Sequence, residues 1–182
     1  MRIRVRFLLL AAIPLLAAAA GVAAASSGKS QRRGPIVHTP EQLLFVPNAL
    51  SGTTMRFSPG TISVRSGGTV TFVNSQRDEP HTVTIVDRSD LPRSAAQVEN
   101  CKACRLALGH LKDPRHPETS PLKTYVLDKG RTGFDARGDS VFLAPAGPHK
   151  HATVHISAPA GTTLYYLCAV HPWMQGSIVV TG

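Results

Sequence analysis

The residues that most constrain this chain lie near its C-terminal end, in the stretch YYLCAVHPWMQGSIVV at 165–180. Cys168, His171 and Met174 stand within seven residues of one another. Thiolate and thioether ligands select soft metals, and imidazole binds many transition metals in more than one oxidation state. The sequence therefore predicts that this segment contributes three ligands to one soft, redox-active metal ion.

A mononuclear site of this kind needs a second imidazole, and the best candidate is His81, in the stretch TVTFVNSQRDEPHTVTI at 69–85. Side chains two apart on a strand share a face, so His81 should point into the core together with Val83 and Ile85. A single Cys, His or Met is more often a packing residue than a ligand. Here three ligand types at close spacing, with a Pro-His strand upstream, favour a metal site.

These motifs resemble those of the cupredoxins, the type 1 blue copper proteins, and within that family the amicyanin and plastocyanin type. The shared features are a short C-x2-H-x2-M loop, Pro172 after the loop histidine and Gly176 two residues after the methionine. Upstream, a strand, an Asn, a short loop and Pro-His also match. The resemblance covers about 43–87 and 141–182. It implies one type 1 copper ion, and the residues that match the ligands are His81, Cys168, His171 and Met174.

The resemblance also assigns roles to these residues. Cys168, as a thiolate, forms the strongest bond to copper, and the two histidines complete a trigonal plane. Met174 is the weak axial ligand, the position that tunes the reduction potential of such sites. Thr82 stands where members of the family often carry a hydrogen-bonding side chain that ties the two ligand segments together. Bonds of that kind orient the ligands of a metal.

The fold class follows from the spacing of apolar residues and turns. Ile62 and Val64 alternate with polar neighbours, as do Val70 and Phe72, and the turn pairs Pro59-Gly60 and Gly67-Gly68 separate the runs. Short strands punctuated in this way predict an all-β sandwich. Together with the resemblance, this predicts a cupredoxin-like Greek-key β-sandwich with a helix-containing insertion before the last strands.

The N-terminal residues predict export. A basic start, the apolar run at 7–20 and small residues before Ser26 are typical of a secretory signal peptide at 1–25. The run is short for a membrane-spanning helix, so we expect no membrane span in the mature chain, although an uncleaved anchor is the alternative. Residues 26–42 are expected to be a flexible leader and 43–182 the cupredoxin domain. The protein should therefore lie in the periplasm, the cell envelope or outside the cell.

An insertion of several tens of residues, at about 88–140, separates the two ligand segments. Ser94 and Gln97 form a capping box, which predicts that a helix of about four turns begins there. Its apolar face should pack on the sandwich and comprises Val98, Cys101, Cys104, Leu108 and Leu111. The rest of the insertion, at 115–140, should form a loop at one end of the sandwich, with a short strand at 124–127.

Cys101 and Cys104 form a C-x2-C pair in a chain expected to be exported. Residues three apart on a helix are close enough for a disulfide, and such bonds persist in oxidising compartments. We therefore predict a disulfide that pins the helix to the end of the sandwich. The alternative is a second metal site that recruits His110 and His116, although that spacing differs from the common zinc pattern. A haem attachment would need His where Arg105 stands.

The function expected from these features is transfer of single electrons between redox partner proteins by an exported monomer with one copper ion. No enzyme activity is expected. The alternative is copper storage or delivery in the envelope, which the histidine group His149, His151 and His155 favours. The net charge of +9 falls to +6 once the three arginines of the signal peptide are removed, and this modest basic excess is expected to steer the chain towards an acidic partner. Nucleic acid is not expected as a partner, because no basic stripe is interleaved with aromatic residues.

Overall fold

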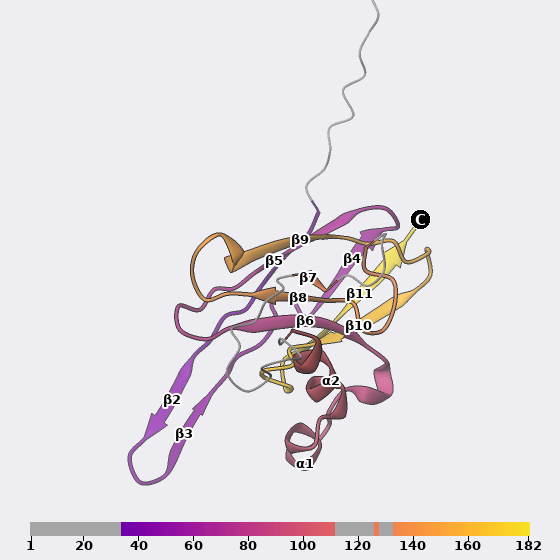
Figure 1. Ribbon diagram of the computed structural model, residues 1–182. Coiled ribbons are helices and arrows are strands. Elements are labelled where there is room, and N and C mark those ends of the chain that lie inside the picture. The colour runs from indigo at the N-terminus through magenta and orange to yellow at the C-terminus, as the bar shows by residue number, and fades with distance from the viewer. Residues whose placement is uncertain (1–33, 112–125, 128–132) are drawn as a thin grey trace, which may run out of the picture. The chain divides into compact units, whose positions relative to one another are not determined.

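The computed structural model describes residues 34–111, 126–127 and 133–182 (Figure 1). All of these residues belong to one compact unit of the chain. The predicted signal peptide and residues 26–33 of the predicted leader lie outside the described residues. Within the described ranges, no helix is long and apolar enough to span a membrane.

The described residues form strands, short helices and turns. The strands are β1 (Ile36–His38), β2 (Leu43–Val46), β3 (Leu50–Thr53), β4 (Thr61–Arg65), β5 (Thr69–Val73), β6 (His81–Val86), β7 (Val126–Leu127), β8 (Ser140–Leu143), β9 (His151–His155), β10 (Thr163–Leu167) and β11 (Gln175–Thr181). The helices are α1 (Ala95–Glu99), α2 (Lys102–Leu111) and the 3-10 turns η1 (Arg88–Asp90) and η2 (Pro148–Lys150).

Two sheets make the body of this unit (Figure 1). One has the order β1-β5-β9 and the other the order β4-β11-β10-β6-β8-β7, while β2 and β3 pair only with each other among the described strands. The pairs β1-β5 and β4-β11 are parallel and the remaining pairs are antiparallel. This arrangement confirms the predicted fold class, an all-β sandwich with a helix-containing insertion.

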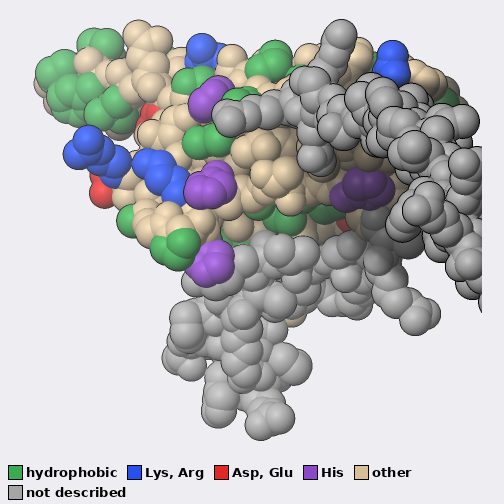
Figure 2. Space-filling model, turned by 90° about the horizontal axis from the view of Figure 1, so that it is seen from above, with side chains coloured by type: hydrophobic (Ala, Val, Ile, Leu, Met, Phe, Trp, Pro, Cys, Tyr) green, Lys and Arg blue, Asp and Glu red, His purple; other side chains and the backbone are tan. Residues whose placement is uncertain are grey.

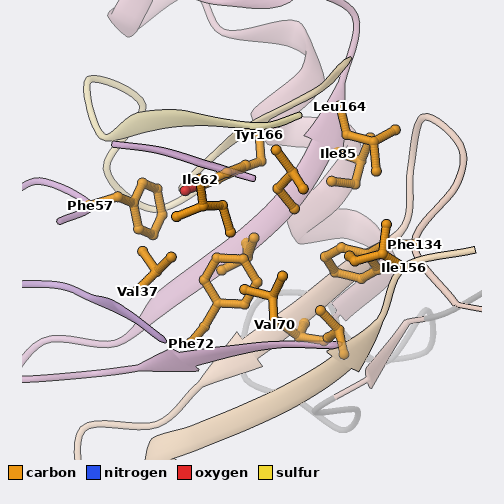
Figure 3. Close-up of a cluster of buried hydrophobic side chains, with 14 of the residues drawn as sticks. Val37, Phe57, Ile62, Val70, Phe72, Ile85, Phe134, Ile156, Leu164 and Tyr166 are labelled. Carbon is orange, nitrogen blue, oxygen red and sulfur yellow. The ribbon is translucent and has the colours of Figure 1, made fainter. Parts of the chain in front are cut away.

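The core lies between the two sheets (Figure 3). Val70 and Phe72 reach into it from β5, and Ile85 and Tyr166 from the larger sheet, as the alternation of apolar residues predicted. The ring of Tyr166 meets the ring of Phe72 edge-on, with 5.5 Å between the ring centroids. Burial of each such side chain contributes about 1.5–3 kcal/mol, so this interface supplies much of the stability of the unit.

Strand β6 is buried on both faces. Val83 and Ile85 belong to the core between the sheets, and His81, fully buried, shares their parity and lies beside the core residue Cys168. Val86 belongs to a second apolar cluster on the outer face. This second cluster brings residues of α2 onto the strands β6 and β10 and includes Cys101, Ala103, Cys104, Ala107, Leu167 and Ala169. The expectation that the helix is pinned at the end of the sandwich is therefore wrong. It covers the outer face of the larger sheet.

The predicted four-turn helix is also divided in two. Ser94 caps α1 as expected, since its hydroxyl accepts a hydrogen bond from the N–H of Gln97 at 3.3 Å. The helix stops at Asn100, whose side chain donates to the carbonyl of Ala96 at 3.0 Å. Asn competes for backbone groups in this way and is a poor residue for a helix interior. A new helix, α2, begins at Lys102.

The part of the insertion after α2 is described only in places. The expected short strand at 124–127 is present as β7, at Val126–Leu127. Most of the expected end loop, and His116 of the alternative metal site, lie outside the described residues.

Two features of the N-terminal part were not predicted. Residues 36–38, expected in the flexible leader, form β1, and Val37 is fully buried because its side chain fills the core beside β5. The hairpin of β2 and β3 carries large apolar side chains that remain in solvent. Leu43 is 72% exposed and Phe45 is 68% exposed. The spacing of apolar residues in the sequence does not distinguish an exposed hairpin strand of this kind from a strand that packs on the core.

Candidate metal centre

The ligand-rich segment is a tight loop between the last two strands. Cys168 follows β10 directly, and Met174 directly precedes Gln175, the first residue of β11. The N–H of Cys168 donates to the carbonyl of Met174 at 3.0 Å, and the N–H of Met174 donates to the carbonyl of His171 at 2.8 Å. These two bonds close the loop on itself, so the protein backbone fixes the positions of all three residues.

The structure brings three of the predicted ligands to one point. The Nδ1 atoms of His81 and His171 lie 3.8 Å from the Sγ of Cys168 and 3.2 Å from each other. One ligand atom from each residue lies within 4.8 Å of the other two, the only such group of three among the described residues. A thiol and two imidazole nitrogens that face one another in this way can hold one metal ion.

Met174, the fourth predicted ligand, is fully buried and belongs to the same core cluster as Cys168. Its side chain therefore lies on the core side of the loop. A thioether there is the donor expected for an axial position.

In the metal-free protein, burial favours the neutral forms of the Cys168 thiol and of the two imidazoles. Burial raises the pKa of the Cys168 thiol, an effect that hydrogen bonds from Thr82 and neighbouring backbone groups offset in part. Burial and the nearby His171 lower the pKa of His81 to about 4. A bound cation removes the thiol proton outright, and it leaves neutral imidazoles free to coordinate.

Thr82 connects the two ligand segments, as the resemblance implied. Its backbone N–H donates to the Sγ of Cys168 at 3.3 Å, and its hydroxyl accepts from the N–H of Ala169 at 2.7 Å. Both bonds are buried. A sulfur that accepts a backbone N–H is less basic and held in one orientation, so Thr82 both positions and tunes the thiolate.

Asn74 holds the loop that leads to His81. It is fully buried, and its side-chain N–H groups donate to the carbonyls of Glu79 at 2.8 Å and Ala144 at 3.1 Å. Its side-chain oxygen accepts from the N–H of Gln76 at 2.8 Å. The sequence offered a signal for this role, because Asn74 shares its parity with the inward-facing Val70 and Phe72. A polar residue at an inward position is expected to satisfy backbone groups.

His171 forms the solvent edge of the site. It is 8% exposed, whereas His81, Cys168 and Met174 are fully buried. Its Nε2 lies 3.6 Å from the carboxylate of Glu79, and its ring packs edge-on against Trp173, which is 45% exposed. Burial lowers the pKa of His171, while the carboxylates of Glu79 and Glu41 raise it. No sequence pattern pointed to Glu79.

The other predicted features are placed as follows. Cys101 and Cys104 form a disulfide, with their Cα atoms 5.3 Å apart, which confirms that prediction. Cys168 is the remaining free cysteine. His149, His151 and His155 do not form a metal-holding group in the described part of the chain. On the face shown in Figure 2 the histidine side chains lie apart from one another, among other residues.

No protein-family model matches the chain, and no curated protein matches its sequence. Among solved structures, an oxidised variant of amicyanin is 15% identical, with a TM-score of 0.40 and 81% of each chain covered. Reduced auracyanin from Roseiflexus castenholzii is 22% identical, with a TM-score of 0.41, 70% of this chain covered and 88% of that chain. Amicyanin from Paracoccus versutus is 15% identical, with a TM-score of 0.36 and 81% and 80% covered. These proteins are cupredoxins, the family that the ligand motifs of this chain resemble.

Proposed function

We propose that this chain is an exported type 1 copper protein that carries single electrons between redox partners, with His81, Cys168, His171 and Met174 as ligands. The observation that supports it best is the buried group of one thiol and two imidazole Nδ1 atoms within 4.8 Å of one another. Copper, when bound there, would supply a reversible one-electron couple. We propose no enzyme activity for the chain.

The residues of the site perform three tasks in this proposal. The loop bonds and the Thr82 bridge hold the ligands in one arrangement, which keeps structural change on electron transfer small. The core around Cys168 and Met174 excludes water from the buried side. The edge of His171 beside Trp173 is the port at which electrons enter and leave, and it suits the small, transient interfaces of redox proteins.

The partner's charge stays a prediction. The net charge of +9 belongs to the whole chain, whereas the residues described here contain nine Lys and Arg and eight Asp and Glu. The charges that act on His171 are the carboxylates of Glu79 and Glu41. Steering by an overall positive charge therefore depends mainly on residues outside the described ranges. Export to the periplasm or envelope rests on the sequence of the first 25 residues.

Titration of the metal-free protein with copper(II) tests the proposal. One equivalent should produce an intense blue absorption, and voltammetry should give a reversible one-electron wave. A colourless protein that binds copper without a reversible wave would contradict electron transfer and would favour storage or delivery. We do not propose that second function, because the surface histidines that favoured it do not gather in the described structure.

A further inference from the structure

The disulfide of the insertion lies at a helix start. Cys101 directly precedes Lys102, the first residue of α2, and Cys104 lies in the first turn. The N–H of Cys104 donates to the Sγ of Cys101 at 3.2 Å. The first turn of a helix presents unpaired N–H groups and the positive end of the helix dipole, and both stabilise a thiolate. If the disulfide is opened, Cys101 is thus placed to carry the negative charge.

The two sulfur-bearing residues have different surroundings. Cys101 lines an open hollow of about 280 Å³ between η1, α1 and the start of α2. Other residues of this hollow are Asp90, Leu91, Asn100 and Lys102. Both cysteines are buried in the apolar cluster on the sheet, Cys101 at 7% and Cys104 at 4% exposure, but Cys104 does not line the hollow. A molecule in the hollow therefore meets Cys101 first.

A purely structural role accounts poorly for this bond. It joins residues three apart in the sequence, and a disulfide that closes so short a loop removes little entropy from the unfolded chain. The helix is already attached to the larger sheet by the packing of Ala103 and Ala107 near Leu167 and Ala169. The C-x2-C spacing with one cysteine before the helix is instead an arrangement in which cysteine pKa values are lowered and thiol exchange is favoured.

We propose that Cys101–Cys104 is a redox-active disulfide that exchanges with low-molecular-weight thiols, with Cys101 as the reacting sulfur and Cys104 as the resolving sulfur. A thiolate attacks the Sγ of Cys101, the S–S bond breaks, and the electron pair leaves on the Sγ of Cys104, which takes up a proton. A second thiolate attacks the external sulfur of the mixed disulfide and releases the Cys101 thiolate, which is then protonated. In total, two thiols are oxidised to one disulfide, and the protein disulfide gains two electrons and two protons. The reaction does not involve the copper ligands, so it goes beyond the proposed electron transfer.

The first test uses the full chain with Cys168→Ser, in which Cys101 and Cys104 are the two remaining cysteines. The probe is glutathione in mixtures of its reduced and oxidised forms, without denaturant. Free thiols are counted by a maleimide mass tag, while circular dichroism reports whether the protein stays folded. The disulfide should open and re-form reversibly in the folded protein as the mixture is changed. A disulfide that stays closed until denaturant unfolds the chain would overturn the proposal.

The second test separates the two sulfurs. In the same background, Cys104→Ser leaves Cys101 and Cys101→Ser leaves Cys104. Each variant is mixed with oxidised glutathione, and mass spectrometry follows the mixed disulfide. Cys101 should react at least about tenfold faster, because it lines the hollow and its thiolate is stabilised by the helix start. Equal rates, or faster reaction of Cys104, would overturn the assignment. If a single variant fails to fold, the glutathione titration above still decides the proposal.

Discussion

Thr82 and Cys168 are joined by a hydrogen bond from a backbone N–H to a sulfur, 3.3 Å long, between residues 86 positions apart in the chain. The bond connects the strand that carries His81 to the loop that carries His171. The hydroxyl of Thr82 adds a second connection, to the N–H of Ala169. The geometry of the candidate site therefore depends on contact between two distant segments as well as on the ligands themselves.

Replacing Thr82 should weaken metal binding without removing a ligand. Thr82→Val keeps the shape and the backbone N–H but leaves the buried N–H of Ala169 without its acceptor. Loss of such an orienting bond typically lowers metal affinity about 10- to 100-fold. Competition with a copper chelator measures the change. Thr82→Ser retains the hydroxyl and is the matched control, and equal affinities of the two variants would show that the hydroxyl has no such role.

Removing the thiolate should abolish the blue colour. Cys168→Ser offers an alcohol, which does not supply the thiolate charge transfer or the soft donor that copper(I) prefers. The visible spectrum after addition of copper(II) measures the effect. His151→Gln, an exposed position on β9, is the control and should keep the full absorption. A Cys168→Ser protein that remained blue would show that the copper ligand lies elsewhere.

Replacing the thioether should change the potential while copper stays bound. Met174→Leu fills a similar volume in the core but removes the weak axial donor, so the reduction potential should rise. Voltammetry of the copper-loaded variant measures the shift. The matched control is Met55→Leu, at a buried methionine outside the proposed ligand set. If both variants keep the potential of the parent protein, Met174 is not the axial ligand.

Asn74 should be important for stability. Asn74→Ala leaves the N–H of Gln76 and the carbonyls of Glu79 and Ala144 without their partner. A fully buried polar group without a partner costs about 1–3 kcal/mol, and these three bonds are partly buried, so the free energy of unfolding should fall by about 2 kcal/mol or more. Urea denaturation of the metal-free protein measures it. Asn100→Ala, at an exposed position, should cost less than about 1 kcal/mol, and a similar loss in both variants would contradict this role.

The metal-free protein should lose stability as the pH falls. The pKa of His81 is about 4 in the folded protein and 6.5 in an unperturbed histidine, so the unfolded chain binds more protons between these values. The contribution of neutral His81 is full above about pH 6.5 and is lost progressively as the pH falls to about 4. Denaturation at several pH values measures the slope. His81→Gln should flatten it, whereas His151→Gln should leave it unchanged.

Much of the candidate site could be predicted because it depends on local spacing. Strand parity placed His81 in the core, and loop spacing placed Cys168, His171 and Met174 in one turn. The carboxylate of Glu79 beside His171 could not be predicted, because that contact depends on how two loops meet in space. The role of Asn74 was open to prediction from its inward parity.

The fold was predicted less completely where a polar residue interrupts a helical pattern, or where tertiary contacts determine which surface an element covers. Of the predicted apolar face, Cys101, Cys104 and Leu108 pack in the cluster on the sheet, whereas Val98 does not. Asn100 ends the first helix, and a new one begins two residues later. The face that the helix covers was wrong, since periodicity shows that a helix is amphipathic and does not show which surface receives it. β1 was missed because a three-residue strand within a polar segment carries a single buried residue, Val37.

The burial of β6 on both faces has a consequence for how the site exchanges its metal. Backbone amides of a strand covered on both sides exchange with solvent mainly through global opening, whereas a loop can open on its own. His81 is therefore expected to stay in place during local fluctuations, while the turn that carries His171 detaches. Copper bound as proposed would then enter and depart through the His171 side, at a rate set by the opening of that turn.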